Sequence, residues 1–160
     1  MDEPVTLFKS PSRLGYTVTA GAVTSQFLRG ILDGKLIGRR CPSCEKVYIP
    51  PRGSCPTCAV PCTTEVELVG TGTVTTFCIV NIPFEGQLLD PPYACAHVLL
   101  DGSDTPLLHL VGGCDVSEVR MGLRVKAAWA DDIQPTLASV KFFEPTGEPD
   151  AEYATYEEHV

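Results

Sequence analysis

Four of the eight cysteines form two Cys-x-x-Cys pairs, CPSC at residues 41–44 and CPTC at residues 55–58. Such pairs can carry redox chemistry, form disulfides or hold a metal ion. A thioredoxin-like redox site is usually a single pair that opens a helix, and a disulfide framework needs an oxidising compartment. Two pairs that are ten residues apart allow four thiolates to converge at about 2.3 Å from one Zn²⁺ ion. The spacing therefore favours a metal clamp.

We predict a structural zinc site, with one ion per chain, whose ligands are Cys41, Cys44, Cys55 and Cys58. Four thiolates complete a tetrahedral shell and leave no position for water or substrate. The metal is therefore expected to stabilise this short segment rather than to catalyse a reaction. Cys62 lies four residues beyond the second pair and is the alternative ligand.

Two positions in these pairs depart from the common pattern. The residue after the second cysteine of such a turn tends to adopt a positive φ, which favours glycine. Glu45 and Ala59 occupy these positions, so we expect turns that are possible but less favourable. The remaining cysteines, Cys78, Cys95 and Cys114, have no basic neighbour, and we expect them to be small buried apolar side chains.

The sequence contains no Gly-x-Ser-x-Gly elbow, no P-loop and no dinucleotide-binding fingerprint. His97 and His109 alternate with apolar residues, which is typical of histidines whose hydrogen bonds are satisfied in or beside a core. Paired acids such as Asp131 and Asp132 lie in polar turns. We therefore predict no catalytic residue and no enzymatic activity of the chain on its own.

The charges are unevenly distributed along an acidic chain that has 20 acids, 12 bases and a net charge of −8. Half of the bases lie between residues 29 and 52, and none lies between residues 53 and 119. The chain therefore has one basic segment, around the first cysteine pair. It lacks the long basic stripe that would follow a nucleic-acid backbone.

The N-terminal segment MDEPVTLFKS is polar and acidic, unlike a signal peptide. No run approaches the roughly 20 apolar residues that span a bilayer. We therefore expect a cytoplasmic protein without membrane contact, in which the thiols stay reduced.

The elements that hold these residues are predicted to be mostly strands, because Gly and Pro are frequent and β-branched runs are common. Residues 20–34 are the exception. Their apolar side chains recur on one face of a helix at Val23, Phe27, Leu28, Ile31 and Leu32. Thr24 or Ser25 is expected to cap this helix, and Gly34 to end it. Gly30 inside the helix suits close contact with another element.

Residues 47–49 are expected to form a short strand between the cysteine pairs. After Pro61, six β-rich runs are separated by turn residues: VELVG, TGTVTTFCIVNI, YACAHVLLDG, TPLLHLVGG, LRVKAAWADD and ASVKFFEP. Short strands at this spacing predict a small barrel or sandwich. Gly70 and Gly72 suit a strong bend or bulge at the start of the longest strand.

The order of these features resembles the DUF35 family over about residues 20–143. The resemblance rests on GILDGKLIGRRC, on CPSC and CPTC with PPR between them, and on VRMGLRVKAAWAD. It implies a mainly β fold with an N-terminal helix, a rubredoxin-like zinc ribbon and a five-stranded OB-fold barrel. Glu45, Ala59 and the acidic tail depart from the family pattern.

This resemblance divides the chain into five parts. They are an irregular arm (1–19), the helix (20–38), the zinc ribbon (39–62), the OB-fold (63–144) and an acidic tail (145–160) that we expect to be disordered.

Members of the family are typically non-catalytic partners of thiolase-fold proteins, including sterol-carrier-type thiolases and aldolases that act on steroid side-chain acyl-CoA thioesters. The resemblance thus implies a subunit of a thiolase-type lyase or acyltransferase complex, a hetero-oligomer in lipid or steroid degradation. In it the chain would support the partner and help to handle acyl-CoA. Cations that could contact CoA phosphates or a partner are Lys35, Arg39, Arg40, Lys46 and Arg52.

The alternative is a protein that binds single-stranded nucleic acid, because zinc ribbons and OB-folds often do so. It would need cations interleaved with aromatic residues on the barrel. Phe77, Phe84 and Tyr93 are present, but no Lys or Arg lies between residues 53 and 119. We therefore expect no nucleic-acid partner.

Overall fold

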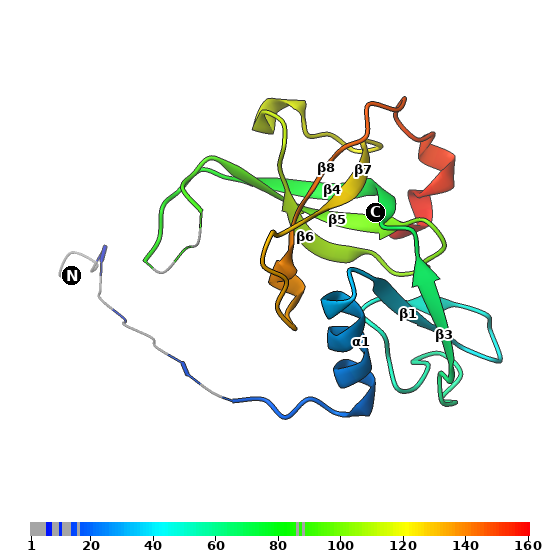
Figure 1. The fold of residues 1–160 in the computed structure, drawn as a ribbon. Helices are drawn as coiled ribbons and strands as arrows, with labels where there is room; N and C mark the ends of the chain where they lie inside the picture. The colour runs from blue at the N-terminus through cyan, green and yellow to red at the C-terminus, as the bar shows by residue number, and fades with distance from the viewer. Residues whose placement is uncertain (1–5, 8–9, 11–13, 16, 86, 88) are drawn as a thin grey trace, which may run out of the picture.

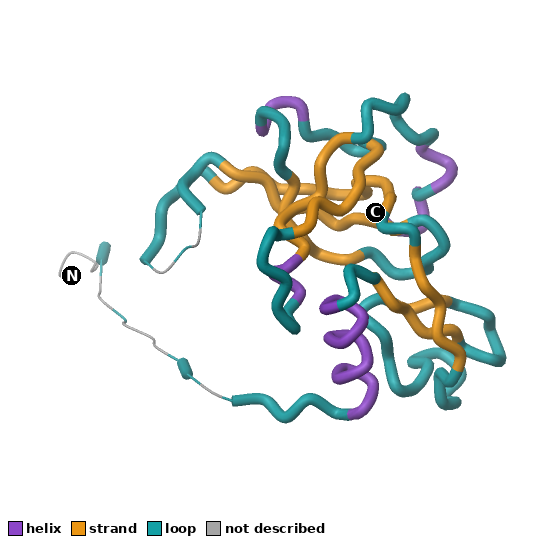
Figure 2. The backbone as a smooth tube through the Cα atoms, in the orientation of Figure 1, coloured by secondary structure: helices purple, strands orange, loops and turns teal. Residues whose placement is uncertain are grey.

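The computed structural model describes residues 6–7, 10, 14–15, 17–85, 87 and 89–160. These residues form an α-helix, a three-stranded sheet and a closed five-stranded barrel (Figures 1 and 2). The predicted mainly β fold with an N-terminal helix is thereby confirmed. The irregular arm expected at residues 1–19 lies largely outside the described residues.

The helix α1 spans Ala22–Leu32. The small sheet has the order β2 (Val47–Tyr48), β1 (Leu36–Arg40), β3 (Thr64–Leu68). The barrel has the order β4 (Thr71–Val80), β5 (Tyr93–Leu100), β6 (Leu107–Val111), β8 (Val140–Pro145), β7 (Arg124–Trp129). Short 3₁₀ turns are η1 (Val116–Glu118), η2 (Leu137–Ser139), η3 (Tyr153–Thr155) and η4 (Glu157–His159).

Helix α1 buries Phe27, Gly30 and Ile31 against β1 and the barrel. A Cβ on Gly30 would lie 2.7 Å from Cγ1 of Ile37, so the missing side chain permits the close approach that the sequence suggested. The N-cap is Gly21, not Thr24 or Ser25, because the Ser25 amide already donates to the Gly21 carbonyl. None of the helices formed by the described residues is long and apolar enough to cross a bilayer.

Gly34 ends the helix, as predicted, with a φ of 69° that favours glycine. The chain then enters β1 at once. Residues 36–38, which the sequence assigned to the helical segment, therefore belong to a strand. Leu36 and Gly38 point into the buried face of that strand, because side chains alternate along it.

The barrel closes because β7 pairs with both β8 and β4. All six β-rich runs after Pro61 form strands, the first being β3 and the others the barrel. A Cβ on Gly72 would lie 2.6 Å from the Leu99 carbonyl oxygen, so only glycine lets β5 pack this closely. The bulge in β4 lies at Val74/Thr76 rather than at the glycines.

The acidic tail is ordered, in contrast to the expectation of disorder. Tyr156 is buried, and the Ala151 amide donates to the carbonyl oxygen of Gly122 over 2.8 Å. Arg120 makes a two-point ion pair with Asp150, at 2.6 and 2.7 Å. Composition indicated disorder, but one buried aromatic side chain and these polar contacts attach the tail to the barrel.

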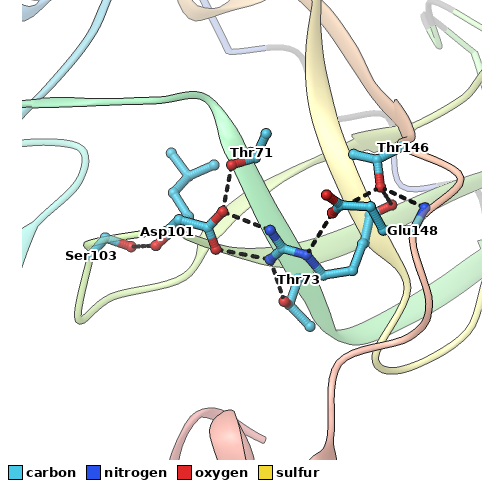
Figure 3. Close-up of polar contacts among 8 residues, drawn as sticks. Thr71, Thr73, Asp101, Ser103, Thr146 and Glu148 are labelled. Carbon is cyan, nitrogen blue, oxygen red and sulfur yellow. Dashed lines mark hydrogen bonds and ion pairs between the residues drawn. The ribbon is translucent and has the colours of Figure 1, made fainter.

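Arg124 links strands that are distant in the sequence (Figure 3). Its guanidinium donates to both carboxylate oxygens of Asp101, at 2.8 and 2.7 Å, and to Thr73 Oγ1 at 2.9 Å. It also lies 3.4 Å from Glu148 at the start of the tail. The hydrogen bonds from Arg124 lower the pKa of Asp101 below its usual value. Arg124 thus joins β7 to the end of β5 and to the tail.

Candidate metal centre

The four cysteines of the two pairs come together in the structure. Cys41 and Cys44 lie in the turn between β1 and β2, whereas Cys55 and Cys58 lie in the loop between β2 and β3. Their four Sγ atoms are all within 4.8 Å of one another. Among the described residues, this is the one group of three or more potential metal-ligating side chains.

Each pair sits in the same kind of turn. The Glu45 amide donates to the Cys41 carbonyl over 3.0 Å, and the Ala59 amide donates to the Cys55 carbonyl over 2.9 Å. These bonds require positive φ values, 64° at Glu45 and 56° at Ala59. The unfavourable turns expected from the sequence therefore form with their non-glycine residues in place.

Backbone amides also point at the sulfur atoms. The Ser43 amide lies 3.4 Å from Cys41 Sγ, and the Cys58 amide lies 3.4 Å from Cys55 Sγ. Amides that donate to sulfur stabilise thiolates, which are the form that binds a metal.

This donor set fits zinc. Zn–S bonds of about 2.3 Å in a tetrahedron place neighbouring sulfur atoms about 3.8 Å apart. The Cys44 and Cys55 Sγ atoms are 3.7 Å apart. Four sulfur ligands close the coordination shell, so an ion held here would cross-link two turns and would have no vacant position for a substrate.

Tyr48 contacts the centre although the sequence analysis did not single it out. Its hydroxyl lies 3.2 Å from Cys55 Sγ. This hydrogen bond, together with amides of the same turn, lowers the pKa of Cys55 to about 6 despite its burial. The same contact raises the pKa of Tyr48. Arg52 lies over the Tyr48 ring, 5.8 Å from its centroid.

The ribbon is attached to the barrel by residues that the sequence analysis also missed. Asp104 accepts a hydrogen bond from the Val47 amide (2.8 Å), and Thr105 Oγ1 accepts one from the Ile49 amide (3.0 Å). Both residues lie in the β5–β6 turn, whose DGSDTP sequence indicated only a turn. Hydrogen bonding of this turn to residues 47 and 49, more than 50 positions earlier, leaves no local pattern in the sequence.

The other cysteines stand apart from the four. Cys62 is buried beside Cys41 and Cys55 but is outside the ligand group. Cys95 and Cys114 are half-buried, and Cys78 is exposed. The expectation of a buried side chain is therefore wrong for Cys78. The reason is that β4 runs past the barrel core at this position.

The two strand histidines differ from each other. His109 is half-buried, its Nδ1 accepts from the Leu110 amide, and its ring packs edge-on against Phe143. Burial lowers the pKa of His109. His97 is exposed on the outer face of the barrel, 3.3 Å from Thr76 Oγ1.

The five predicted cations are largely engaged within the ribbon and β3. Three of them make ion pairs: Lys35–Glu67 (2.8 Å), Arg39–Glu65 (3.6 Å) and Arg40–Glu45 (3.6 Å). Arg39 also donates to the Cys62 carbonyl oxygen over 3.1 Å. In the described part of the chain, Lys46 and Arg52 make no ion pair, so they are the cations left for an external anion.

Comparisons with known proteins agree with this architecture. Residues 29–61 match the family model described as "ChsH2, rubredoxin-like zinc ribbon domain". Residues 65–130 match the one described as "ChsH2, C-terminal OB-fold domain". A "DUF35 domain-containing scaffold protein" of Methanocaldococcus jannaschii is 30% identical over 95 residues, which cover 59% of this chain and 67% of that protein.

Two solved structures share the fold. The first, described as "Ltp2-ChsH2(DUF35) aldolase", has a TM-score of 0.63 and 22% identity, and covers 81% of this chain and 98% of that chain. The second is a DUF35-family protein of unknown function from Sulfolobus solfataricus, with a TM-score of 0.59 and 23% identity. It covers 78% of this chain and 84% of that one.

Proposed function

Because the chain belongs to the DUF35 family, we propose that it is a non-catalytic accessory subunit. It associates with a thiolase-fold enzyme of acyl-CoA metabolism, of the sterol-carrier-type thiolase or aldolase class. The observation that carries the proposal is the cluster of four thiols, which can hold zinc but leaves no open position for chemistry.

In this proposal Cys41, Cys44, Cys55 and Cys58 hold one zinc ion. Bound zinc supplies a cross-link between the two turns of the ribbon. The chain contributes the Tyr48 hydroxyl and the Cys58 amide, which favour the thiolate form of Cys55. The ribbon is then a rigid module fixed to the barrel through Asp104 and Thr105.

The proposed partner is supported by the descriptions of the relatives. One is called a scaffold protein, and another forms part of an aldolase structure with a second component. We extend these descriptions to the present chain and propose a hetero-oligomer that acts on steroid side-chain or other lipid acyl-CoA thioesters.

Contact with CoA is proposed for Lys46 and Arg52. Lys35, Arg39 and Arg40 already neutralise acids of β3 and the first cysteine turn. Lys46 is exposed next to that turn, where a phosphate could reach it without displacing an internal partner.

The barrel offers one of the two features that nucleic-acid binding needs. Phe77 and Phe84 are exposed, as stacking would require, but no Lys or Arg lies between residues 53 and 119. Binding of single strands combines stacking with a cationic groove. No cation lies beside these aromatic residues in the sequence, and the β7 cations Arg124 and Lys126 are paired with acids.

Co-expression tests the proposal. The chain is co-produced with each thiolase-type protein of its own genome, and complexes are identified by size-exclusion chromatography with light scattering. We expect one stoichiometric complex that turns over acyl-CoA thioesters, and no turnover by the chain alone. Absence of any such complex, or turnover without a partner, would contradict the proposed function.

A further inference from the structure

The β4–β5 hairpin extends beyond the barrel as an arm. Before its bulge, β4 pairs with β7 through Thr71, Gly72 and Thr73. Beyond the bulge at Val74/Thr76 it pairs only with β5, as far as Val80. Figure 1 shows the two strands continuing past the other strands to a loop well away from the barrel. We call residues 76–85, 87 and 89–96 the arm.

Large apolar side chains gather on the arm and face solvent. Ile82 is 78% exposed and Phe84 is 57% exposed, and Phe77, Ile79 and Leu89 are also exposed. Single exposed apolar residues are ordinary, but five on one projecting hairpin are a concentration of the kind found at protein interfaces.

The arm also borders a groove on the barrel. Two adjoining pockets of about 370 and 300 Å³ share Leu89 of the arm, Leu110 of β6 and Lys141 of β8. Most of the other lining side chains are apolar, among them Leu137 and Phe142. Leu89 therefore belongs both to the apolar side chains of the arm and to the lining of the groove.

The arm also has an open strand edge. Within the described residues, no strand pairs with the side of β4 that faces away from β5 beyond the bulge. Such an edge carries unpaired amides and carbonyls, to which an extended segment of another protein can add.

The charge of the arm indicates which kind of partner can bind this surface. The arm carries Glu85 and Asp90 and has no Lys or Arg, so phosphate backbones and anionic lipids are disfavoured. A second copy would bring the same acids to the contact. A protein with an apolar recess and a basic rim fits best. The groove adds one cation, Lys141, which lies over the Phe142 ring.

We propose that the arm, with its adjoining groove, is the main docking surface for the partner enzyme, rather than the basic ribbon. This inference rests on the proposed function, because it names the surface by which that partner is held. Three of the five predicted cations, Lys35, Arg39 and Arg40, already form ion pairs within the chain, so they would attract a partner only weakly. Exposed ion pairs also contribute little to binding affinity.

Two arm variants and a matched control test the inference. Ile82→Asp and Phe84→Asp place a charge within the apolar surface, and Val69→Asp does the same at a residue that is 84% exposed between β3 and β4. Circular dichroism and zinc content verify that each variant folds. We expect each arm variant to raise the Kd for the co-expressed partner by about ten-fold or more, with Val69→Asp within about two-fold of wild type.

Hydrogen exchange on the wild-type complex separates this inference from the proposed function. Protection of residues 76–80 in a complex with a thiolase-type enzyme supports both. Protection of the arm by a protein of another class supports the docking surface and contradicts the function. Unaffected affinity of both arm variants, with protection on the ribbon alone, overturns the docking surface and leaves the function standing.

The remaining outcomes count against the inference. If the chain self-associates and Phe84→Asp converts it to a monomer, the occupant is a second copy. If no protein binds the chain, both proposals fail.

Discussion

Glu45 and Ala59 adopt the left-handed backbone conformation, which L-amino acids disfavour, with φ values of 64° and 56°. A side chain in this region costs about 1–2 kcal/mol because Cβ crowds the carbonyl oxygen. The turns form nevertheless, because the backbone hydrogen bonds from these two amides to the carbonyl oxygens of Cys41 and Cys55 require that geometry. The two cysteine turns are therefore strained at Glu45 and Ala59.

Ala59→Gly should relieve one of these strains and raise the free energy of unfolding of the zinc-saturated protein by about 1 kcal/mol. Ala138→Gly, at an exposed position without positive φ, is the control and should lower it slightly. Denaturant unfolding measures both. If Ala59→Gly and Ala138→Gly destabilised the protein equally, the backbone at Ala59 would not be strained.

Tyr48→Phe should weaken zinc binding near neutral pH. The tyrosine hydroxyl helps to hold the pKa of Cys55 at about 6, so without it the thiol carries its proton to higher pH. Zinc must then displace that proton, and the apparent affinity at pH 7 should fall by about ten-fold. A competition titration with a chelator measures it.

The deficit of Tyr48→Phe should disappear above about pH 9, where the thiol is ionised in both proteins. A deficit that is independent of pH would show that the phenol acts by packing alone.

At the residue scale, the sequence indicated which cysteines come together because Cys-x-x-Cys spacing is local. It gave no sign of Tyr48, whose contact with Cys55 depends on the pairing of β1 and β2. Nor did it show that Lys35 would be neutralised by Glu67, 32 residues away.

At the scale of elements, alternation and turn residues predicted every barrel strand. They could not predict how β4 divides into a barrel half and a projecting half, because that division depends on where pairing with the distant strand β7 ends. Likewise, β6 meets β8 in parallel although the two are not consecutive. Such contacts between distant segments leave no periodic signal.

The ion pair between β7 and the end of β5 predicts a pH dependence of stability. The pKa of Asp101 is lowered by Arg124, so the folded state favours the carboxylate. The ion pair stabilises the fold fully at pH values above the pKa of an aspartate in the unfolded chain, about 3.9. This stabilisation is lost as the pH falls through the lower pKa that Asp101 has in the folded state. Because Asp101 is partly exposed, it amounts to about 1 kcal/mol.

Asp101→Asn should therefore be less stable than wild type at pH 6, and the difference should shrink toward pH 2. Urea unfolding across this range measures it. Asp90→Asn, at an exposed carboxylate without an ion pair in the described chain, should show no such convergence. A constant difference for Asp101→Asn would count against the ion pair.

At the scale of the whole molecule, the tail shows where composition misleads. Five of its last thirteen residues are acidic, which suggests a solvated segment. Yet Gly122 has no side chain, and a Cβ there would lie 3.3 Å from the Tyr156 hydroxyl. One aromatic ring thus fits against the barrel and orders the segment around it.

Tyr156→Ala should lower the free energy of unfolding by about 2–3 kcal/mol, the scale of a buried aromatic side chain. Tyr153→Ala is the matched control. Tyr153 is exposed and makes a T-shaped ring contact with Tyr156, so its loss should cost less than about 1 kcal/mol. Equal effects in a thermal or denaturant melt would argue against the attached tail.

The described part of the chain therefore consists of helix α1, a cysteine ribbon fixed to a barrel, a tail packed on the barrel and an arm that projects from it. Ribbon and barrel give rigidity, and the arm presents an apolar surface that nothing in the described chain covers. This division suits a subunit whose role is to hold another protein.

Native mass spectrometry of the complex purified through a tag on this chain tests the central claim most directly, because one spectrum reports both metal and partner. We expect one zinc ion for each copy of the chain, in a stoichiometric assembly with a thiolase-fold enzyme. A metal-free chain, or a zinc-loaded chain with no such enzyme, would contradict the account.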